Sequence, residues 1–345
     1  MSASSTYVGR FAPSPSGPLH RGSLVAAMAS YLDAKAHGGR WLLRIEDIDQ
    51  GRSRAQTSQQ IISDLLKLGF QIEPHPWYQS QRGPHYQRAF DKLQSMRRVY
   101  ACICSRKEIA DSRGLNAVQV GSHRLAVHNS SMASSVYPGT CRKIFEAGQS
   151  PPIQAVRAWR LKLDPALIEW QEGAWLRPHV FADNARRAGV EKSNLQREEI
   201  TCRVGDFVIA RPSRPGDDEG LEWTYQLSVV VDDEESGVSH VVRGMDLLGS
   251  TSRQIYLQNL LGYRRLMYWH CPLVLEPNGQ KLSKQNGAQA INSDLALPTL
   301  NRALSDLGLT GFSSSRLSGM TLTQFWELAL GLWRERMLAT RPDIN

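Results

Sequence analysis

The first hundred residues alternate short apolar runs with segments whose apolar positions recur every three or four residues. The runs at 7–11 and 40–45 predict strands, and the spacing within 24–32, 61–66 and 86–93 predicts helices. Strands that alternate with helices are typical of a parallel sheet. We therefore predict an α/β fold with a Rossmann-like, doubly wound parallel sheet. Ligands of such sheets bind beyond the carboxyl ends of the strands.

The middle of the chain has a weaker pattern. Between about 102 and 200 the periodicity fades and serines accumulate, which predicts an inserted, smaller subdomain. The pattern then resumes, with strands expected at 204–210, 238–243 and 266–275, a helix at 255–261, and an apolar run at 225–231 before two aspartates. Trp326, Leu330, Trp333 and Met337 recur at helical spacing and predict a core-facing helix. The predicted divisions are 1–101 and 204–290 for the two halves of the sheet domain, 102–203 for the insert and 291–345 for a short helical C-terminal region.

Charge and composition narrow the class of protein. Lys and Arg number 41 against 33 Asp and Glu, and the net charge of +8 suits a nucleic-acid partner, although many basic proteins bind none. We find neither an apolar run long enough for a membrane helix nor a secretory signal at the start. A cytoplasmic protein with no membrane partner is therefore expected.

Five cysteines in a chain without a predicted signal favour a metal site over a disulfide framework. Cys102, Cys104 and Cys141 are the candidate ligands, and three thiolates suit a structural Zn²⁺. Buried cysteines without a metal are the alternative. Cys202 and Cys271 are expected to be structural.

Two polar loops follow predicted strands at opposite ends of the sheet domain. Residues 17–23, GPLHRGS, lead into a helix, where backbone N–H groups and the helix dipole can receive phosphate. Residues 279–285, GQKLSKQ, place a serine between two lysines that can neutralise a triphosphate. Each loop alone is better explained as an ordinary turn. Together, and in this order, they resemble the HIGH and KMSKS signatures of class I aminoacyl-tRNA synthetases.

Three longer segments narrow the resemblance to the glutamyl and glutaminyl branch: RFAPSPSGPLH at 10–20, RIEDID at 44–49 and VRGMDL at 242–247. The resemblance implies a ligase that activates L-glutamate with ATP and Mg²⁺ to form glutamyl-adenylate. It implies ATP contacts from His20, Gly22, Ser23, Lys281, Ser283 and Lys284, with His20 and Lys284 catalytic. It implies glutamate contacts from Arg10, Phe11, Ala12, Pro13, Ser14, Glu46, Tyr225 and Arg243.

The chemistry of these residues agrees with the implied roles. Arginine offers a substrate carboxylate a planar, bidentate fork that stays charged. Glu46, at the end of a predicted strand, can pair with the substrate ammonium group. Asp47 and Asp49 are expected in a solvated turn, and Arg44 in a structural ion pair.

Some positions depart from the branch or extend its pattern. Arg21 stands where a hydrophobic or aromatic residue is usual and adds charge beside the phosphate loop, while Gln285 replaces a common serine. For the metal site the resemblance implies Tyr137 as the fourth ligand, and His123 and His128 are rival ligands.

Only 60 residues follow Gln285, fewer than a further domain needs, so no anticodon-binding domain is expected. In this the chain resembles the shortened glutamyl-queuosine tRNA(Asp) synthetase family. That resemblance implies transfer of glutamate to queuosine in the anticodon of tRNA(Asp), by a monomer whose partners are ATP, L-glutamate and this tRNA. Three alternatives stay open: a truncated glutamyl-tRNA synthetase charging tRNA(Glu), a non-catalytic RNA-binding module, and a small-molecule adenylate-forming nucleotidyltransferase.

Overall fold

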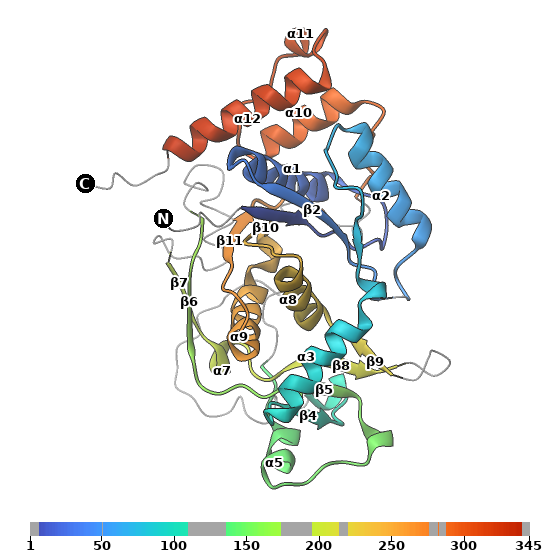
Figure 1. Ribbon diagram of the computed structural model, residues 1–345, viewed down its shortest axis with the longest axis vertical. Coiled ribbons are helices and arrows are strands. Elements are labelled where there is room, and N and C mark those ends of the chain that lie inside the picture. The colour runs from blue at the N-terminus through green and yellow to red at the C-terminus, as the bar shows by residue number, and fades with distance from the viewer. Residues whose placement is uncertain are drawn as a thin grey trace, which may run out of the picture.

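The computed structural model describes residues 7–49, 51–109, 136–173, 195–213, 220–275, 282 and 288–339 (Figure 1). Its strands are β1 (Val8–Phe11), β2 (Arg40–Ile45), β3 (Trp77–Tyr78), β4 (Val99–Cys102), β5 (Ala158–Leu161), β6 (Leu167–Gln171), β7 (Leu195–Glu199), β8 (Phe207–Pro212), β9 (Leu221–Trp223), β10 (His240–Gly244) and β11 (Met267–Cys271). Its α-helices are α1 (Arg21–Ala36), α2 (Ala55–Lys67), α3 (Gly83–Ser95), α5 (Thr140–Glu146), α7 (Ile200–Arg203), α8 (Tyr225–Glu235), α9 (Thr251–Leu261), α10 (Ala296–Asp306), α11 (Ser314–Leu317) and α12 (Leu322–Ala339). Short 3-10 segments are η1 (Gln79–Gln81), η2 (Ile153–Ala155) and η4 (Met245–Ser250).

Parallel strands form the region that the sequence predicts as a sheet. β1, β2 and β3 pair in that order, and β10 pairs with β11, all in parallel. β10 starts beside β1, because the backbone N–H of Ser239 donates to the carbonyl oxygen of Val8 at 2.9 Å. The strands predicted at 7–11 and 40–45 are confirmed, and so is the α/β character of the fold.

Helix α1 lies between these strands and the C-terminal helices (Figure 1). Its residues Leu24, Val25 and Met28 are completely buried. Phe325 and Trp333 of α12 are buried in the same hydrophobic core, which confirms the core-facing stripe predicted for this segment. The C-terminal helices are therefore part of the core around the parallel strands.

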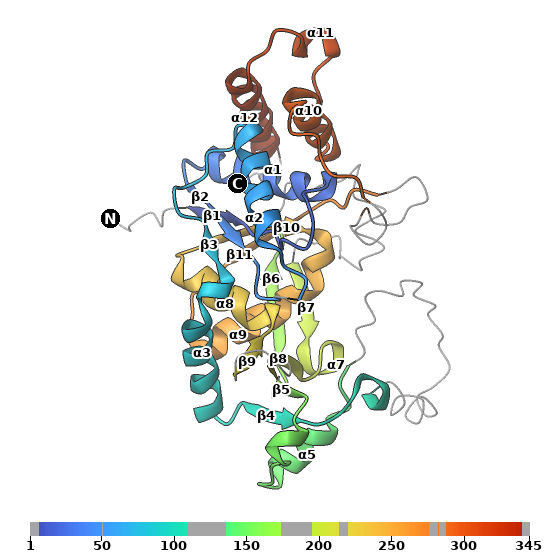
Figure 2. The same cartoon turned by 90° about the vertical axis from the view of Figure 1, so that its right-hand side faces the viewer.

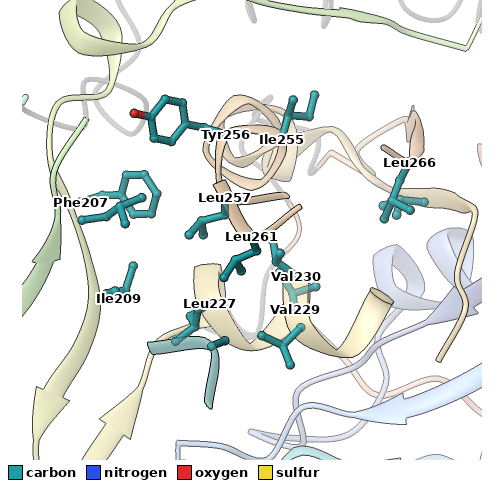
Figure 3. Packing of buried hydrophobic residues seen from close by; sticks show 14 of the residues in the cluster. Phe207, Ile209, Leu227, Val229, Val230, Ile255, Tyr256, Leu257, Leu261 and Leu266 are labelled. Atoms are coloured by element: carbon teal, nitrogen blue, oxygen red, sulfur yellow. The ribbon is translucent and has the colours of Figure 1, made fainter. Parts of the chain in front are cut away.

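A second hydrophobic core lies around α8 and α9. The apolar run at 225–231 forms α8, and Leu227, Val229 and Val230 lie close to Leu257 and Leu261 of α9 (Figure 3). A helix that is apolar around its circumference is buried on all sides, so an apolar run of this length does not itself distinguish a helix from a strand.

The end of the molecule opposite α12 contains an antiparallel sheet with the order β4-β5-β8-β9 (Figures 1 and 2). The strand predicted at 204–210 begins at Phe207 and pairs with β5 in this sheet, so it does not resume the parallel pattern. β6 and β7 form a separate antiparallel pair. No helix in the described part of the chain is long and apolar enough to cross a membrane.

Candidate active site

A cavity of about 260 Å³ lies at the carboxyl ends of β1, β2 and β10. Its wall includes all eight residues predicted to contact glutamate, which are Arg10, Phe11, Ala12, Pro13, Ser14, Glu46, Tyr225 and Arg243. His20, Gly22 and Ser23 of the predicted phosphate loop line the same cavity. Ligands of parallel sheets bind at this position. Residues from four distant segments therefore meet in one cavity, and their individual roles remain predictions.

His20 is the N-cap of α1 and shapes the loop before the helix. Its backbone is extended, and its Nδ1 accepts the backbone N–H of Ser23 at 3.3 Å. The proton of a neutral ring then sits on Nε2. A Cβ at Gly22 would lie 3.1 Å from the His20 ring, so a side chain there would crowd it. Together His20 and Gly22 form a compact helix N-terminus, which favours anions.

Leu282 is the residue of the predicted lysine loop that the structure describes, and it lines the cavity. Its backbone N–H donates to the carbonyl oxygen of Val274 at 2.9 Å. Lys281, Ser283 and Lys284 lie outside the described residues, so the structure does not place the predicted phosphate contacts of this loop.

Arg21 differs from its prediction. Its Nε lies 3.1 Å from Oδ2 of Asp306 in α10, and Arg21 is not among the residues that line the cavity. The carboxylate of Asp306 therefore compensates its charge, and Arg21 does not strengthen the positive field of the phosphate loop.

Arg10 and Arg44 extend from β1 and β2 into a buried ion-pair network. Arg44 Nη1 donates to Asp233 Oδ1 at 2.6 Å, and Arg10 Nε donates to the same oxygen at 3.3 Å. Arg44 also donates through Nη2 to Glu46 Oε1 at 3.3 Å, which confirms the predicted structural ion pair. Burial alone would raise the pKa of Asp233, but Arg44 and Arg10 outweigh it and the pKa is lowered.

Glu46 directly follows β2, and its backbone N–H donates to the carbonyl oxygen of Pro13 at 3.0 Å. Burial raises the pKa of its carboxyl group to about 7, although Arg44 and Arg10 oppose the shift. A cationic ligand beside such a carboxyl group favours its ionised form. The site is therefore suited to an ammonium group.

Asp47 and Asp49, next to Glu46, have local partners. Asp47 accepts the backbone N–H and the hydroxyl of Ser80 at 2.8 and 2.7 Å. Asp49 accepts from Arg52 Nε at 2.7 Å. Neither aspartate lines the cavity, as expected for residues of a polar turn.

Arg243, at the end of β10, is held by four uncharged side chains. Its Nε donates to His270 Nε2 at 3.1 Å, and its Nη2 donates to the hydroxyl of Thr251 at 2.8 Å. Its Nη1 donates to Gln254 Oε1 at 2.7 Å and to the hydroxyl of Tyr225 at 3.4 Å. These contacts fix the plane of the guanidinium group without neutralising it, so Arg243 is oriented to bind a carboxylate.

Three cysteines meet beyond the end of β4, as predicted. The Sγ atoms of Cys102, Cys104 and Cys141 all lie within 4.8 Å of one another, and a tetrahedral zinc site needs sulfur atoms about 3.8 Å apart. The hydroxyl of Tyr137 lies 3.5 Å from Cys102 Sγ and 3.4 Å from Cys104 Sγ. Burial and the neighbouring thiols raise the pKa of Cys104 to about 12. These donors fit a thiophilic cation, which would favour the thiolate forms.

The remaining candidate metal ligands and the two remaining cysteines have different outcomes. His123 and His128 lie outside the described residues. Cys271 is buried in the core around α1, as expected for a structural cysteine. Cys202 is exposed, so the prediction of a structural packing role is wrong for its side chain.

Sequence reasoning assigned no role to four buried groups beside the cavity. Asp232 and Asp233 supply counterions for arginines in the parallel strands. The sequence did indicate such partners, because a charged residue within a buried strand needs an opposite charge. Glu172 and His270 lie behind Arg243, and no comparable spacing pointed to them.

The parallel strands, the cavity at their ends and the capped helix beside it match the catalytic domain of class I aminoacyl-tRNA synthetases. The family model described as "tRNA synthetases class I (E and Q), catalytic domain" matches residues 7–163 and 216–325. The chain belongs to this family.

Similar proteins carry more specific names. The glutamyl-Q tRNA(Asp) synthetase of Verminephrobacter eiseniae is 47% identical over 335 residues, which cover 97% of this chain and 99% of that protein. The protein of the same name from Janthinobacterium sp. (strain Marseille) is 42% identical, over 96% of this chain and 97% of that protein.

Among solved structures, the glutamate-tRNA synthetase from Elizabethkingia anophelis is similar in fold, with a TM-score of 0.56 and 24% identity. The alignment covers 82% of this chain and 53% of that protein, so this chain spans about half the length of the solved synthetase.

Proposed function

We propose that this chain activates L-glutamate with ATP and transfers the glutamyl group to queuosine in the anticodon of tRNA(Asp). The observation that carries the proposal is the single cavity lined by every residue predicted for glutamate and by the histidine loop predicted for ATP. The names of relatives that match over nearly their full length support the choice of acceptor.

In the activation step, an oxygen of the glutamate α-carboxylate attacks the α-phosphorus of ATP. The bond between that phosphorus and its bridging oxygen breaks, so glutamyl-adenylate forms and pyrophosphate leaves. Mg²⁺ bound with ATP would neutralise charge on the phosphate oxygens. Positioning and charge neutralisation supply the catalysis, and no protein nucleophile is needed.

The chain's own residues would divide this work. Arg10 and Arg243, the latter with Tyr225, would orient substrate carboxylates, and Glu46 would pair with the ammonium group. His20 and Lys284 would bind the phosphates, with Lys284 facing the departing pyrophosphate. The fixed contacts of Arg243 support this division, because they orient the guanidinium group before the substrate binds.

In the transfer step, a hydroxyl of the queuosine cyclopentenediol would attack the carbonyl carbon of the adenylate. The bond to the phosphate oxygen breaks, AMP leaves, and the hydroxyl proton passes to solvent. The vicinal hydroxyls resemble those of a ribose, so the same mixed anhydride serves without new catalytic groups. The net charge of +8 supports binding of the tRNA backbone, which should weaken steeply as salt is added.

We also infer a Rossmann-like, doubly wound arrangement around the cavity and a zinc-bearing subdomain. Cys102, Cys104, Cys141 and Tyr137 would hold Zn²⁺, and the sulfur spacing supports this ligand set. A closed set of four protein ligands indicates a structural role. Metal analysis of protein purified without chelators should find about one zinc per chain, and protein without zinc would contradict this inference.

Glutamate-dependent exchange between ATP and labelled pyrophosphate tests the activation step. The wild type should exchange label, Arg243→Ala should require far more glutamate, and the exposed Arg264→Ala serves as the control. Wild-type protein without exchange would instead indicate a non-catalytic RNA-binding module.

Labelled glutamate and purified tRNA test the acceptor. We expect transfer to tRNA(Asp) that contains queuosine and none to tRNA(Asp) that lacks it. Preferential charging of tRNA(Glu) would overturn the proposed acceptor and support a shortened glutamyl-tRNA synthetase.

A further inference from the structure

The orientation of Arg243 depends on a buried imidazole ring. His270 is fully buried on β11, and its Nε2 lies 3.1 Å from Arg243 Nε. Arginine N–H groups only donate, so this nitrogen of His270 carries no proton. The proton of the neutral ring is therefore on Nδ1, on the side away from Arg243.

Thr251 is compatible with the same tautomer. Its hydroxyl oxygen accepts from Arg243 Nη2 at 2.8 Å and lies 3.3 Å from His270 Nε2. Because the oxygen accepts from arginine, the hydroxyl proton is available to donate to Nε2. The Arg243 contact thus needs an unprotonated Nε2, and Thr251 can donate its hydroxyl proton to the same nitrogen.

Glu172 supplies the acceptor on the opposite side of the ring. Its Oε1 and Oε2 lie 2.9 and 3.0 Å from His270 Nδ1, and Oε1 also accepts the backbone N–H of His270 at 2.6 Å. The indole N–H of Trp170 donates to Oε2 at 3.3 Å. Burial lowers the pKa of His270 more than the carboxylate raises it, so the ring stays neutral.

The segment that carries Glu172 approaches β11 closely. Glu172 forms a parallel bridge with Tyr268, and the backbone N–H of Gly173 donates to the Tyr268 carbonyl oxygen at 3.3 Å. A Cβ at Gly173 would lie 2.2 Å from the Trp269 ring, so a side chain there would force the segment away. Glu172 and Gly173 both lie between the two parts of the chain that the family model matches.

We propose that Glu172 is a positioning residue for the glutamate pocket: it fixes the His270 tautomer, and His270 in turn fixes the guanidinium plane of Arg243. The inference rests on the proposed function, since it gives the substrate of the cavity as glutamate. A segment outside the family match thereby sets the geometry of an arginine at the centre of the site. Without Glu172, the guanidinium group of Arg243 can rotate. This rotation weakens the binding of glutamate more than the binding of ATP.

The tautomer can be measured in the wild-type protein without any assay of activity. In ¹⁵N-labelled protein, the imidazole spectrum should show a His270 ring with a protonated Nδ1 and a bare Nε2, identified by its loss in His270→Asn. A ring protonated on Nε2, or on both nitrogens, would overturn the proposal.

Steady-state exchange kinetics test the consequence for the pocket. Glu172→Ala should raise the KM for glutamate at least about tenfold with little change in the KM for ATP, because the misplaced group contacts glutamate. Glu172→Gln, which keeps an acceptor for Nδ1–H, should recover part of the loss. Glu169→Ala, an exposed position on β6, the strand that ends just before Glu172, is the control.

The outcomes separate the two proposals. If the wild type exchanges pyrophosphate and folded Glu172→Ala keeps a wild-type KM for glutamate, the positioning role is wrong while the function stands. Equal increases in both KM values would also contradict it, because they would indicate a general structural defect. If Glu172→Ala does not fold, Glu172→Gln and the wild-type tautomer still decide the question. If the wild type shows no glutamate-dependent exchange, the proposed function itself is contradicted, and the positioning role that rests on it is contradicted too.

Discussion

The two arginines of the cavity are anchored in opposite ways. Arg10 shares the carboxylate of Asp233 with Arg44, so a buried acid already compensates much of its charge. Arg243 is held by His270, Thr251, Gln254 and Tyr225, which orient it and leave its charge intact. The first arrangement stabilises the junction between the parallel strands and α8. The second preserves a cation for a ligand.

The difference shows why burial and charge alone do not identify a binding arginine. Both side chains are almost completely buried and both line the cavity. A carboxylate partner reduces the field that a substrate carboxylate would experience, whereas neutral partners preserve it. We therefore expect stability to depend more on the Arg10 network, and glutamate affinity more on Arg243.

The largest effect on stability is expected when the buried acid that pairs with Arg10 and Arg44 is replaced. Asp233→Asn would leave Arg10 and Arg44 buried with less negative charge, at a cost of about 3–5 kcal/mol in the free energy of unfolding. Thr251→Val, which removes one neutral partner of Arg243, should cost less, about 1.5–3 kcal/mol. Urea unfolding of the two variants provides the measurement, and equal losses would contradict the distinction.

Substrate affinity should show the reverse order. Arg243→Lys loses the fork that His270 and Thr251 orient, and it should raise the KM for glutamate about tenfold to a hundredfold, as expected when a charged hydrogen bond is lost. Arg10→Lys should raise it less, because Asp233 already compensates that charge. The comparison requires pyrophosphate exchange at several glutamate concentrations. A larger effect at Arg10 would reverse our interpretation.

A smaller effect should appear in the pH dependence of glutamate binding. Glu46 has a pKa of about 7 because it is buried, so the carboxylate that pairs with an ammonium group forms as the pH rises. Arg44, Arg10, Asp233 and Asp232 set its surroundings. The KM for glutamate should therefore fall by up to about tenfold between pH 6 and pH 8. Glu46→Gln should bind glutamate weakly at both pH values, and a flat wild-type profile would exclude the proposed pairing.

Prediction from the sequence succeeds best where one stretch of chain contains both a strand or helix and the residues that line the cavity. The strands at 7–11 and 40–45 and the helix after His20 are found in the structure, and their loops line the cavity. Local periodicity and loop composition carry that information, because each depends on residues close together in the chain.

Pairing between distant segments was harder to predict. Nothing in residues 204–210 indicates that this strand joins β5 in an antiparallel sheet. The contact between Glu172 and His270 joins residues far apart in the chain and depends on how β6 approaches β11. The role of Asp233 was easier to predict, because arginines within apolar strands need a buried acid to compensate their charge.

The packing of α12 on α1 has a consequence for how the chain is made. Phe325 and Trp333 are completely buried in the core that contains α1, and the indole of Trp326 donates to the carbonyl oxygen of Leu68 at 3.0 Å. Translation produces α1 early, so its apolar surface stays uncovered until synthesis has passed residue 333. Contacts between such distant segments form slowly, and the intermediates that precede them expose apolar surface and tend to aggregate. The core around α1 therefore stays incomplete until the last helix has been synthesised.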